Sequence, residues 1–371
     1  MISGLLLPPA SRRPSPGRLR ARTVAGAALL LATLGGCTTT DAPLPADELA
    51  ALPGSLVFAS ERAATRGVYR LDFGGEAVRL SAPDADEVPL AVSPDGAALV
   101  VGRAVPVEGG ALEQLVLLED GAARPLTPPR RRARHPAWSP DGRWIVFESD
   151  LDAFSDVYRV DRAGGPLTRL TNDPEGNFEP TVSPDGAAIL FASSRDQQAE
   201  IYRMQADGAT QTRLPASPRD EWRARWSPDG QHVVVLSNER GRDELYLMDA
   251  DGVGRRRLNA SRPDAGAAEV LEAEPTWSPD GRSLAYSTRS RTGAGQIWRL
   301  DLSDGQHHAL TDSTATNGAP VWSPDGRYLA FVSDRDGDGE LYVMRADGSG
   351  PTRLTTSPAE DWMPLWVPSS P

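Results

Sequence analysis

Three residues with side chains suited to acid–base chemistry share one position in a repeated pattern. His135, Glu179 and Glu274 each lie three residues before the residue that precedes a Ser-Pro-Asp-Gly tetrad. Two carboxylates can act as acid and base in glycoside hydrolysis, and an imidazole can transfer protons near neutral pH. The two glutamates lie two repeats apart, and the spacing leaves the distance between them open.

Several other chemistries lack the residues they need. The sequence has no lysine, which excludes Schiff-base catalysis and a lysine general base. Of the other three histidines, His232 lies in a different repeat from His307 and His308, whose side chains would point to opposite faces of a strand. The stretch 334–340 begins like an EF-hand loop but has Arg345 where the bidentate glutamate belongs. We therefore expect no metal site and no cofactor.

The tetrad itself is the strongest signal in the sequence. Six copies begin at spacings of 46, 44, 44, 51 and 45 residues, at Ser93, Ser139, Ser183, Ser227, Ser278 and Ser323. Proline presets the first turn residue, aspartate and serine bond to nearby backbone, and glycine accepts a left-handed conformation. We interpret the tetrad as a hairpin turn and not as a reaction site.

Each repeat contains four short apolar runs. In the last unit they span 319–322, 328–332, 340–344 and 352–355, rich in Val, Leu, Tyr and Phe and bounded by Gly, Pro and Asp. Such runs are typical of strands, and four antiparallel strands in about 45 residues form one propeller blade. The sequence therefore predicts an all-β propeller.

The chain ends indicate how the ring closes. Residues 56–60 match a second strand and 365–368 match a first strand, so the C-terminal strand should complete the N-terminal blade. The predicted second strands lie near Val57, Leu99, Val146, Leu190, Val234, Ala285 and Ala330. We predict seven blades, with six as the alternative, and the unit after Ser93, with a loop containing Pro106, is among the weakest.

The first 36 residues have the organisation of a secretion signal. Five arginines precede an apolar run over 24–34, which is too short to span a bilayer, and Leu34-Gly35-Gly36 leads into Cys37. This stretch resembles the bacterial lipobox, in which the cysteine is acylated and becomes the new N-terminus. We expect a signal peptide over 1–36, a lipidated tether over 37–54 and a propeller over 55–371. The protein would then be anchored in the cell envelope, facing the periplasm or the cell surface.

The charge balance excludes nucleic acid as a partner. The chain has a net charge of -12, and removing five arginines and no acid with the signal gives -12 - 5 = -17. Binding of phosphate backbones needs a cationic surface.

Residues 322–337 and 340–348 resemble the repeat of TolB-like propellers, and the similarity extends over about 55–369. The resemblance implies a propeller that binds an envelope protein. The same repeat also caps prolyl oligopeptidase-type hydrolases. Strands begin near Leu56, which leaves no room for the N-terminal α/β domain that TolB itself carries.

Variable loops at one mouth of the channel are the expected binding site, because loops on a rigid scaffold commonly carry function. We predict a lopsided pocket lined by Arg134, His135, Phe178, Glu179, Trp222, Arg223, Glu274 and Trp362. The favoured hypothesis is a monomeric, non-enzymatic scaffold for a protein or a glycan of the envelope. The alternatives are an enzyme acting on an extracellular glycan or peptide through Glu179, Glu274 or His135, and a sensor of small anions through the arginine run 130–134.

Overall fold

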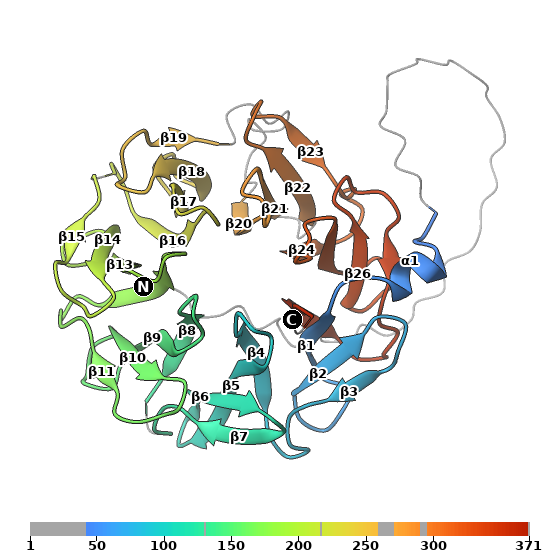
Figure 1. Ribbon diagram of the computed structural model, residues 1–371, viewed down its shortest axis with the longest axis horizontal. Helices are drawn as coiled ribbons and strands as arrows, with labels where there is room; N and C mark the ends of the chain where they lie inside the picture. Colours follow the sequence, from blue (N-terminus) through green and yellow to red (C-terminus); the bar gives the residue numbers. More distant parts are fainter. Residues whose placement is uncertain (1–41, 130, 216, 259–270, 290–294, 370–371) are drawn as a thin grey trace, which may run out of the picture. The chain divides into compact units, whose positions relative to one another are not determined.

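A ring of seven sheets surrounds a central opening (Figure 1). The computed structural model describes residues 42–129, 131–215, 217–258, 271–289 and 295–369, with the side chains of 271–274 left out. Each sheet in this part of the chain has four antiparallel strands, and the only helix there is the short α1 (Ala46–Ala50). The prediction of an all-β propeller with seven blades is confirmed.

In blades 2 to 7, the four strands follow one another from the channel outwards. The strands of blades 2 to 4 are β4 (Glu87–Val92), β5 (Ala98–Val107), β6 (Gly110–Glu119), β7 (Ala122–Pro125), β8 (Ala133–Trp138), β9 (Trp144–Ser149), β10 (Asp156–Asp161), β11 (Thr168–Arg169), β12 (Asn177–Val182), β13 (Ala188–Ser193), β14 (Glu200–Gln205) and β15 (Thr212–Arg213). The strands of blades 5 to 7 are β16 (Glu221–Trp226), β17 (His232–Ser237), β18 (Glu244–Asp249), β19 (Arg256–Arg257), β20 (Leu271–Trp277), β21 (Ser283–Arg289), β22 (Gly295–Asp301), β23 (His307–Ala309), β24 (Asn317–Trp322), β25 (Tyr328–Ser333), β26 (Glu340–Arg345) and β27 (Thr352–Arg353).

Blade 1 joins the two ends of the described chain. Its order is β28-β1-β2-β3, with β28 (Asp361–Val367) innermost, followed by β1 (Ser55–Ser60), β2 (Gly67–Asp72) and β3 (Ala77–Arg79). Leu365 pairs with Val57, as the sequence predicts for a first strand against a second strand. The ring is therefore closed by backbone hydrogen bonds between β28 and β1.

The core lies between neighbouring blades. Second strands such as β9 and β13 are buried along their whole length. Each lies between the first and third strands of its blade, and the adjacent blades cover both faces of its sheet. Their apolar side chains therefore form clusters that join one blade to the next, such as Leu190 with Val235 between blades 4 and 5. Apolar residues on both faces explain why these runs do not alternate in polarity.

The tetrads form the turns that the sequence predicts. In each copy the serine hydroxyl bonds to the aspartate Oδ1, and the backbone N–H that opens the second strand donates to the serine Oγ, as at Ser139, Asp141 and Trp144. The glycine of this copy, Gly142, has a φ of 67°. The serine hydroxyl and the aspartate Oδ1 are thus used within the turn, which supports a structural role.

The tryptophans before the tetrads tie neighbouring blades together. Trp138 Nε1 donates to the carbonyl of Ala91 in the preceding blade, and Trp322 Nε1 donates to Thr276 in the same way. The residue that precedes the tetrad thus contributes to packing between blades.

Blade 2 differs from the prediction. Pro106 lies within β5 and pairs with Ala111, so the expected loop is instead the end of the longest hairpin in the described structure. Proline is tolerated at the outer end of a hairpin because few neighbouring groups there require a hydrogen bond from the backbone N–H that proline lacks. A weak sequence pattern therefore still forms a complete blade.

The described part of the predicted tether lies against the propeller. The Leu44 N–H donates to Thr352 Oγ1, and Glu48 in α1 forms an ion pair with Arg345 at 2.5 Å. Leu44 and Leu52 are buried with blade 1 and blade 7 residues in one apolar cluster. Residues 42–54 thus differ from an extended tether, because their leucines find an apolar surface to cover.

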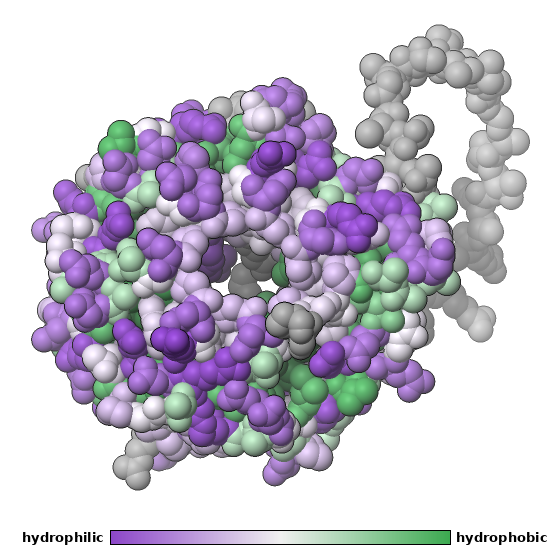
Figure 2. Space-filling model, in the orientation of Figure 1, coloured by the Kyte–Doolittle hydropathy of each residue, from purple (hydrophilic) through white to green (hydrophobic). Residues whose placement is uncertain are grey.

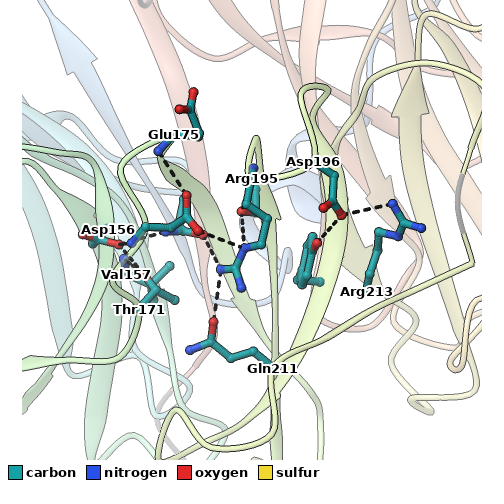
Figure 3. Close-up of polar contacts among 12 residues, drawn as sticks. Asp156, Val157, Thr171, Glu175, Arg195, Asp196, Gln211 and Arg213 are labelled. Carbon is teal, nitrogen blue, oxygen red and sulfur yellow. Dashed lines mark hydrogen bonds and ion pairs between the residues drawn. The ribbon is translucent and has the colours of Figure 1, made fainter.

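A buried carboxylate connects blades 3 and 4. Asp156 is fully buried, and its Oδ1 accepts hydrogen bonds from Thr171 Oγ1 at 2.7 Å and from Asn177 Nδ2, in the next blade, at 2.8 Å. Arg169 binds its other oxygen, and Arg195 donates to Asn177 nearby. Arg195 also donates to Gln211 (Figure 3). The network fully partners a charge that would otherwise be costly to bury.

Replacing Asp156 with alanine is expected to lower the free energy of unfolding by about 3–5 kcal/mol, because the buried Asn177 and Thr171 would lose their acceptor and Arg169 would lose its main ionic partner. Urea titration of the two proteins measures the difference. Asp152→Ala is the matched control: this half-exposed carboxylate also contacts Arg169, at 3.5 Å, and should cost at most about 1 kcal/mol. Equal losses in both variants would contradict the role of the buried network.

Candidate binding site at the channel mouth

The innermost strands share a backbone irregularity at the predicted site. Pairing with the second strand shifts register in the middle of each first strand, and non-glycine residues there have left-handed φ angles near 50°. In the described residues, these positions are His135, Glu179, Arg223, Ala319 and Met363. Because this conformation is costly for residues with a Cβ, it persists only where surrounding contacts hold it.

Glu148, at the end of β9, holds this irregularity in blades 3 and 4. Its Oε2 lies 2.9 Å from His135 Nδ1 and accepts the backbone N–H of Glu179 at 2.9 Å. Its Oε1 forms an ion pair with Arg134 at 2.8 Å. One buried carboxylate therefore positions three predicted site residues.

The surroundings of Glu148 favour its ionised form. Burial opposes ionisation, but the hydrogen bond and charge of His135, the Glu179 N–H and Arg134 together hold the pKa of its carboxyl below its usual range. The carboxylate is thus a fixed negative charge at the base of the mouth.

An equivalent contact joins blade 4 to blade 5. Glu179 Oε2 accepts the backbone N–H of Arg223 at 2.8 Å, and its Oε1 lies 3.7 Å from Arg223 Nε. Each acidic side chain thus supports the irregular backbone of the following blade. Since Glu179 is committed to this contact, it is poorly placed to act as a free acid or base.

The predicted aromatic residues lie at the mouth in half-buried positions. Trp222 packs against the apolar clusters on both sides of blade 5, and Phe178 packs against the cluster between blades 4 and 5. Trp362 is half-buried at the start of β28. Packing accounts for much of the surface of Trp222, so the charged residues are the more available contacts.

The two sides of the ring present different chemistry at equivalent positions. Blades 3 to 5 have His135, Glu179 and Arg223, whereas blades 7 and 1 have Ala319 and Met363. The backbone of Glu274 lies in β20, and its side chain lies outside the described part of the structure. The space-filling view shows that an opening remains in the centre of the ring (Figure 2).

The arginine run is divided by the fold. Arg134 is bound to Glu148, whereas Arg131 and Arg132 are exposed in the preceding loop, and Arg130 lies outside the described residues. The run therefore does not form a single anion site in the described structure.

Sequence reasoning missed three charged residues near these positions. Glu148 and Arg225 each occupy a place that is uncharged in the other six blades. Glu148 pairs with Arg134 on the first strand of its blade, and the matching pairs identify the equivalent positions in the other blades. These positions hold Ala59, Gly102, Ala192, Leu236, Ser287 and Val332. Aligning the second strands as well as the first would have revealed this signal.

The third missed residue is Glu113, on the long hairpin of blade 2. Its carboxyl occupies the space above Gly102, where an added Cβ would come within 2.4 Å of Glu113 Oε1. Burial raises the pKa of this carboxyl, and the positive charges of His135 and Arg134 oppose the shift. Glu113 is therefore near the charged side of the mouth.

Two kinds of feature are absent from the described ranges. No group of three His, Cys, Asp or Glu side chains there could hold a metal ion. Within those same ranges, no helix combines the length and apolar character needed to cross a membrane.

A closed ring of seven four-stranded sheets, built on one tetrad-bearing repeat, defines the class of protein as a seven-bladed β-propeller. Within this class, the model of the TolB beta propeller domain matches residues 114–265, 221–317 and 273–370, which together exceed half of the chain. The chain belongs to this family, and the resemblance seen in its repeat is confirmed.

Individual relatives are more distant. The Tol-Pal system protein TolB of Anaeromyxobacter dehalogenans (strain 2CP-C) is 33% identical over 109 residues, which cover 28% of this chain and 25% of that protein. The chain thus spans about a quarter of the length of the curated TolB relatives that it matches.

Solved structures share the fold. TolB from Acinetobacter baumannii is 22% identical with a TM-score of 0.54, over 85% of this chain and 67% of that one. An oligogalacturonate lyase in complex with manganese is 18% identical with a TM-score of 0.60, over 82% and 86%. At such identities a common fold is compatible with different functions.

Proposed function

We propose that this protein is a lipid-anchored, extracytoplasmic binding scaffold that holds a protein or another component of the cell envelope at the mouth of its channel. The signal-like residues 1–36 and Cys37 would place it in the envelope, and the TolB relatives work in the Tol-Pal system that their name states. The protein would act as a monomer without a cofactor.

This proposal depends mainly on one observation: charged residues lie on one side of the channel mouth, and contacts within the protein hold them there. On one side of the ring, Glu148 holds the His135 side chain and the Glu179 backbone, and Glu179 in turn holds the Arg223 backbone. Charged groups with restricted motion lose little conformational entropy on binding, and an uneven charge distribution orients a partner. A surface of this kind suits recognition of one macromolecule in one orientation.

The enzymatic alternative receives less support. Glu179 is committed to Arg223, and the described part of the mouth holds no metal-binding cluster. Glu113, whose pKa is raised by burial, is the carboxyl that best fits a general acid. The neighbouring carboxylate of Glu148 is committed to Arg134, His135 and the Glu179 N–H, so it is poorly placed to act as the second group.

Reversing the charge of Arg223 should abolish partner capture. In-cell crosslinking and pulldown from the native envelope would compare wild type with Arg223→Glu, and we expect recovery of the partner to fall at least about tenfold. Arg213→Glu is the matched control, because its side chain is equally exposed, at 41%, but lies on the outer strand β15.

We expect the partner to be recovered with the Arg213→Glu variant and to be lost with the Arg223→Glu variant. Equal recovery of the partner with both variants would show that the channel mouth is not its binding site. If the wild type captured nothing that a Cys37→Ser variant does not also capture, the proposal of an envelope scaffold would be contradicted.

A further inference from the structure

One arginine of the channel has no acidic partner. Arg225 lies in the middle of β16, between the buried residues Ala224 and Trp226, and its own side chain is exposed. β16 is the innermost strand of blade 5 and lies beside the central opening (Figure 1), so we take the exposed side of Arg225 to face the channel. Arg225 thus projects a guanidinium group into the channel.

The equivalent positions in the other blades are uncharged. Pairing with the second strand identifies this ring of positions, since Arg225 faces Val234 just as Val321 faces Ala330. The other members are Ala91, Ala137, Thr181, Thr276, Val321 and Leu365. Small side chains on blades 2 to 4 leave space on the side of the ring where the charged residues gather.

Most arginines near the blade interiors are bound by carboxylates, as Arg169 is by Asp156 and Arg353 is by Glu340. In the described structure, Arg225 has no carboxylate oxygen within ion-pair distance, and its hydrogen bond is from Nη1 to the neighbouring Ala224 carbonyl at 2.9 Å. Four of its five N–H donors therefore remain available.

The surroundings make this cation unusual. Although solvent reaches its side chain, the protein atoms that partly enclose Arg225 lower its pKa, the nearby positive charge of Arg223 lowers it further, and Glu179 opposes the shift. Arg223 itself is held only loosely by Glu179, at 3.7 Å. Two guanidinium groups thus lie near each other in a confined place, where a bound anion would relieve their repulsion.

We propose that Arg225, assisted by Arg223, binds a carboxylate group that enters the channel from the mouth. Guanidinium groups pair with carboxylates through two parallel hydrogen bonds, which a lysine cannot reproduce. The carboxylate can belong to an acidic side chain of a macromolecular partner or to a free small molecule. The first source deepens the proposed scaffold function and rests on it, whereas the second does not.

Citrate is the probe for the free-ligand source. Titration calorimetry and thermal melting of the purified full-length protein would compare citrate with chloride at equal ionic strength. We expect citrate to raise Tm of the wild type, and Arg225→Gln to weaken citrate binding at least about tenfold. Arg225→Lys should recover only part of the affinity. Arg203→Gln, which removes an exposed arginine without an ion pair from the middle of β14, should bind as wild type.

The stability of the free variants separates binding from a structural role. Removal of an enclosed cation without a carboxylate partner should leave Tm of the unliganded protein unchanged or higher. A lower Tm in Arg225→Gln, with citrate binding retained, would show that the arginine serves the fold and would overturn the proposal.

Envelope pulldown with Arg225→Gln tests the macromolecular source. Loss of the partner, without any effect of citrate on the wild type, would assign the carboxylate to that partner. Retention of the partner in Arg225→Gln but not in Arg223→Glu, again without a citrate effect, would overturn the carboxylate site and leave the scaffold function standing. A citrate effect lost in Arg225→Gln, with no partner captured by the wild type, would support the site while contradicting the scaffold.

Discussion

A chain that ends at Glu360 is expected to lose on the order of 5 kcal/mol of its free energy of unfolding, and roughly 10 °C in Tm. The deletion removes β28, whose Trp366 and Val367 are buried, and exposes the inner edge of β1. Trp366 also belongs to the cluster that contains Leu56 and Phe58. Without this strand, nothing closes blade 1 on its channel side.

Thermal melting and urea titration would measure this loss, and a chain that ends at Ser369 provides the control because it keeps the whole of β28. The control should unfold with the full-length protein. If the chain ending at Glu360 melted within about 2 °C of both, ring closure by β28 would contribute little to stability, contrary to the pairing observed.

Replacing Glu148 with alanine is expected to lower the free energy of unfolding by about 3–5 kcal/mol, because the half-buried Arg134 and His135 and the Glu179 N–H lose the buried carboxylate that they share. The left-handed backbone at His135 and Glu179 would lose the contacts that hold it. Glu175→Ala removes an exposed carboxylate from the same region and should change stability by less than about 0.5 kcal/mol. A loss in Glu148→Ala no larger than in this control would contradict the role of Glu148.

Acidification should reveal the same contact. The pKa of Glu148 is lower in the folded protein than its ordinary value of 4.5, so the folded state binds its proton less readily than the unfolded state does. This carboxyl therefore contributes stability above pH 4.5 that is lost as the pH falls through the folded pKa. The difference between wild type and Glu148→Gln in urea titrations should accordingly shrink between pH 6 and pH 3. A difference that stays constant would exclude this linkage.

The architecture was predictable because its determinants are local. Each tetrad forms its own turn within five residues, as Ser139 does with Asp141 and Trp144, and each strand shows its apolar run directly. The match of 365–368 to a first strand was sufficient to predict closure, since every blade must have four strands. These signals do not depend on how the sheets are arranged around the channel.

The candidate site was predictable only in part, because its contacts cross between blades. The bond from the Glu179 N–H to Glu148 joins residues 31 positions apart, and it depends on the approach of two separate sheets. Alignment of the mouth positions identified Glu179 and Arg223 but not the carboxylate that supports them. Arg225 escaped notice because it lies two residues beyond the aligned loop positions, Trp222 and Arg223. Leu44 and Leu52 lie in a proline-containing stretch whose composition suggested a tether, although they cover an apolar surface.

The docked N-terminal segment has a mechanical consequence. Leu44 and Glu48 bind blade 7, whereas β1, which follows a few residues later, belongs to blade 1. The segment therefore bridges the joint at which the ring is closed without a covalent bond. Tension applied at the N-terminus would reach the Glu48–Arg345 pair and the Leu44 contact before it reached the β1–β28 hydrogen bonds. The strain of an attached chain would thus be absorbed outside the ring, and the geometry of the channel would be preserved under load.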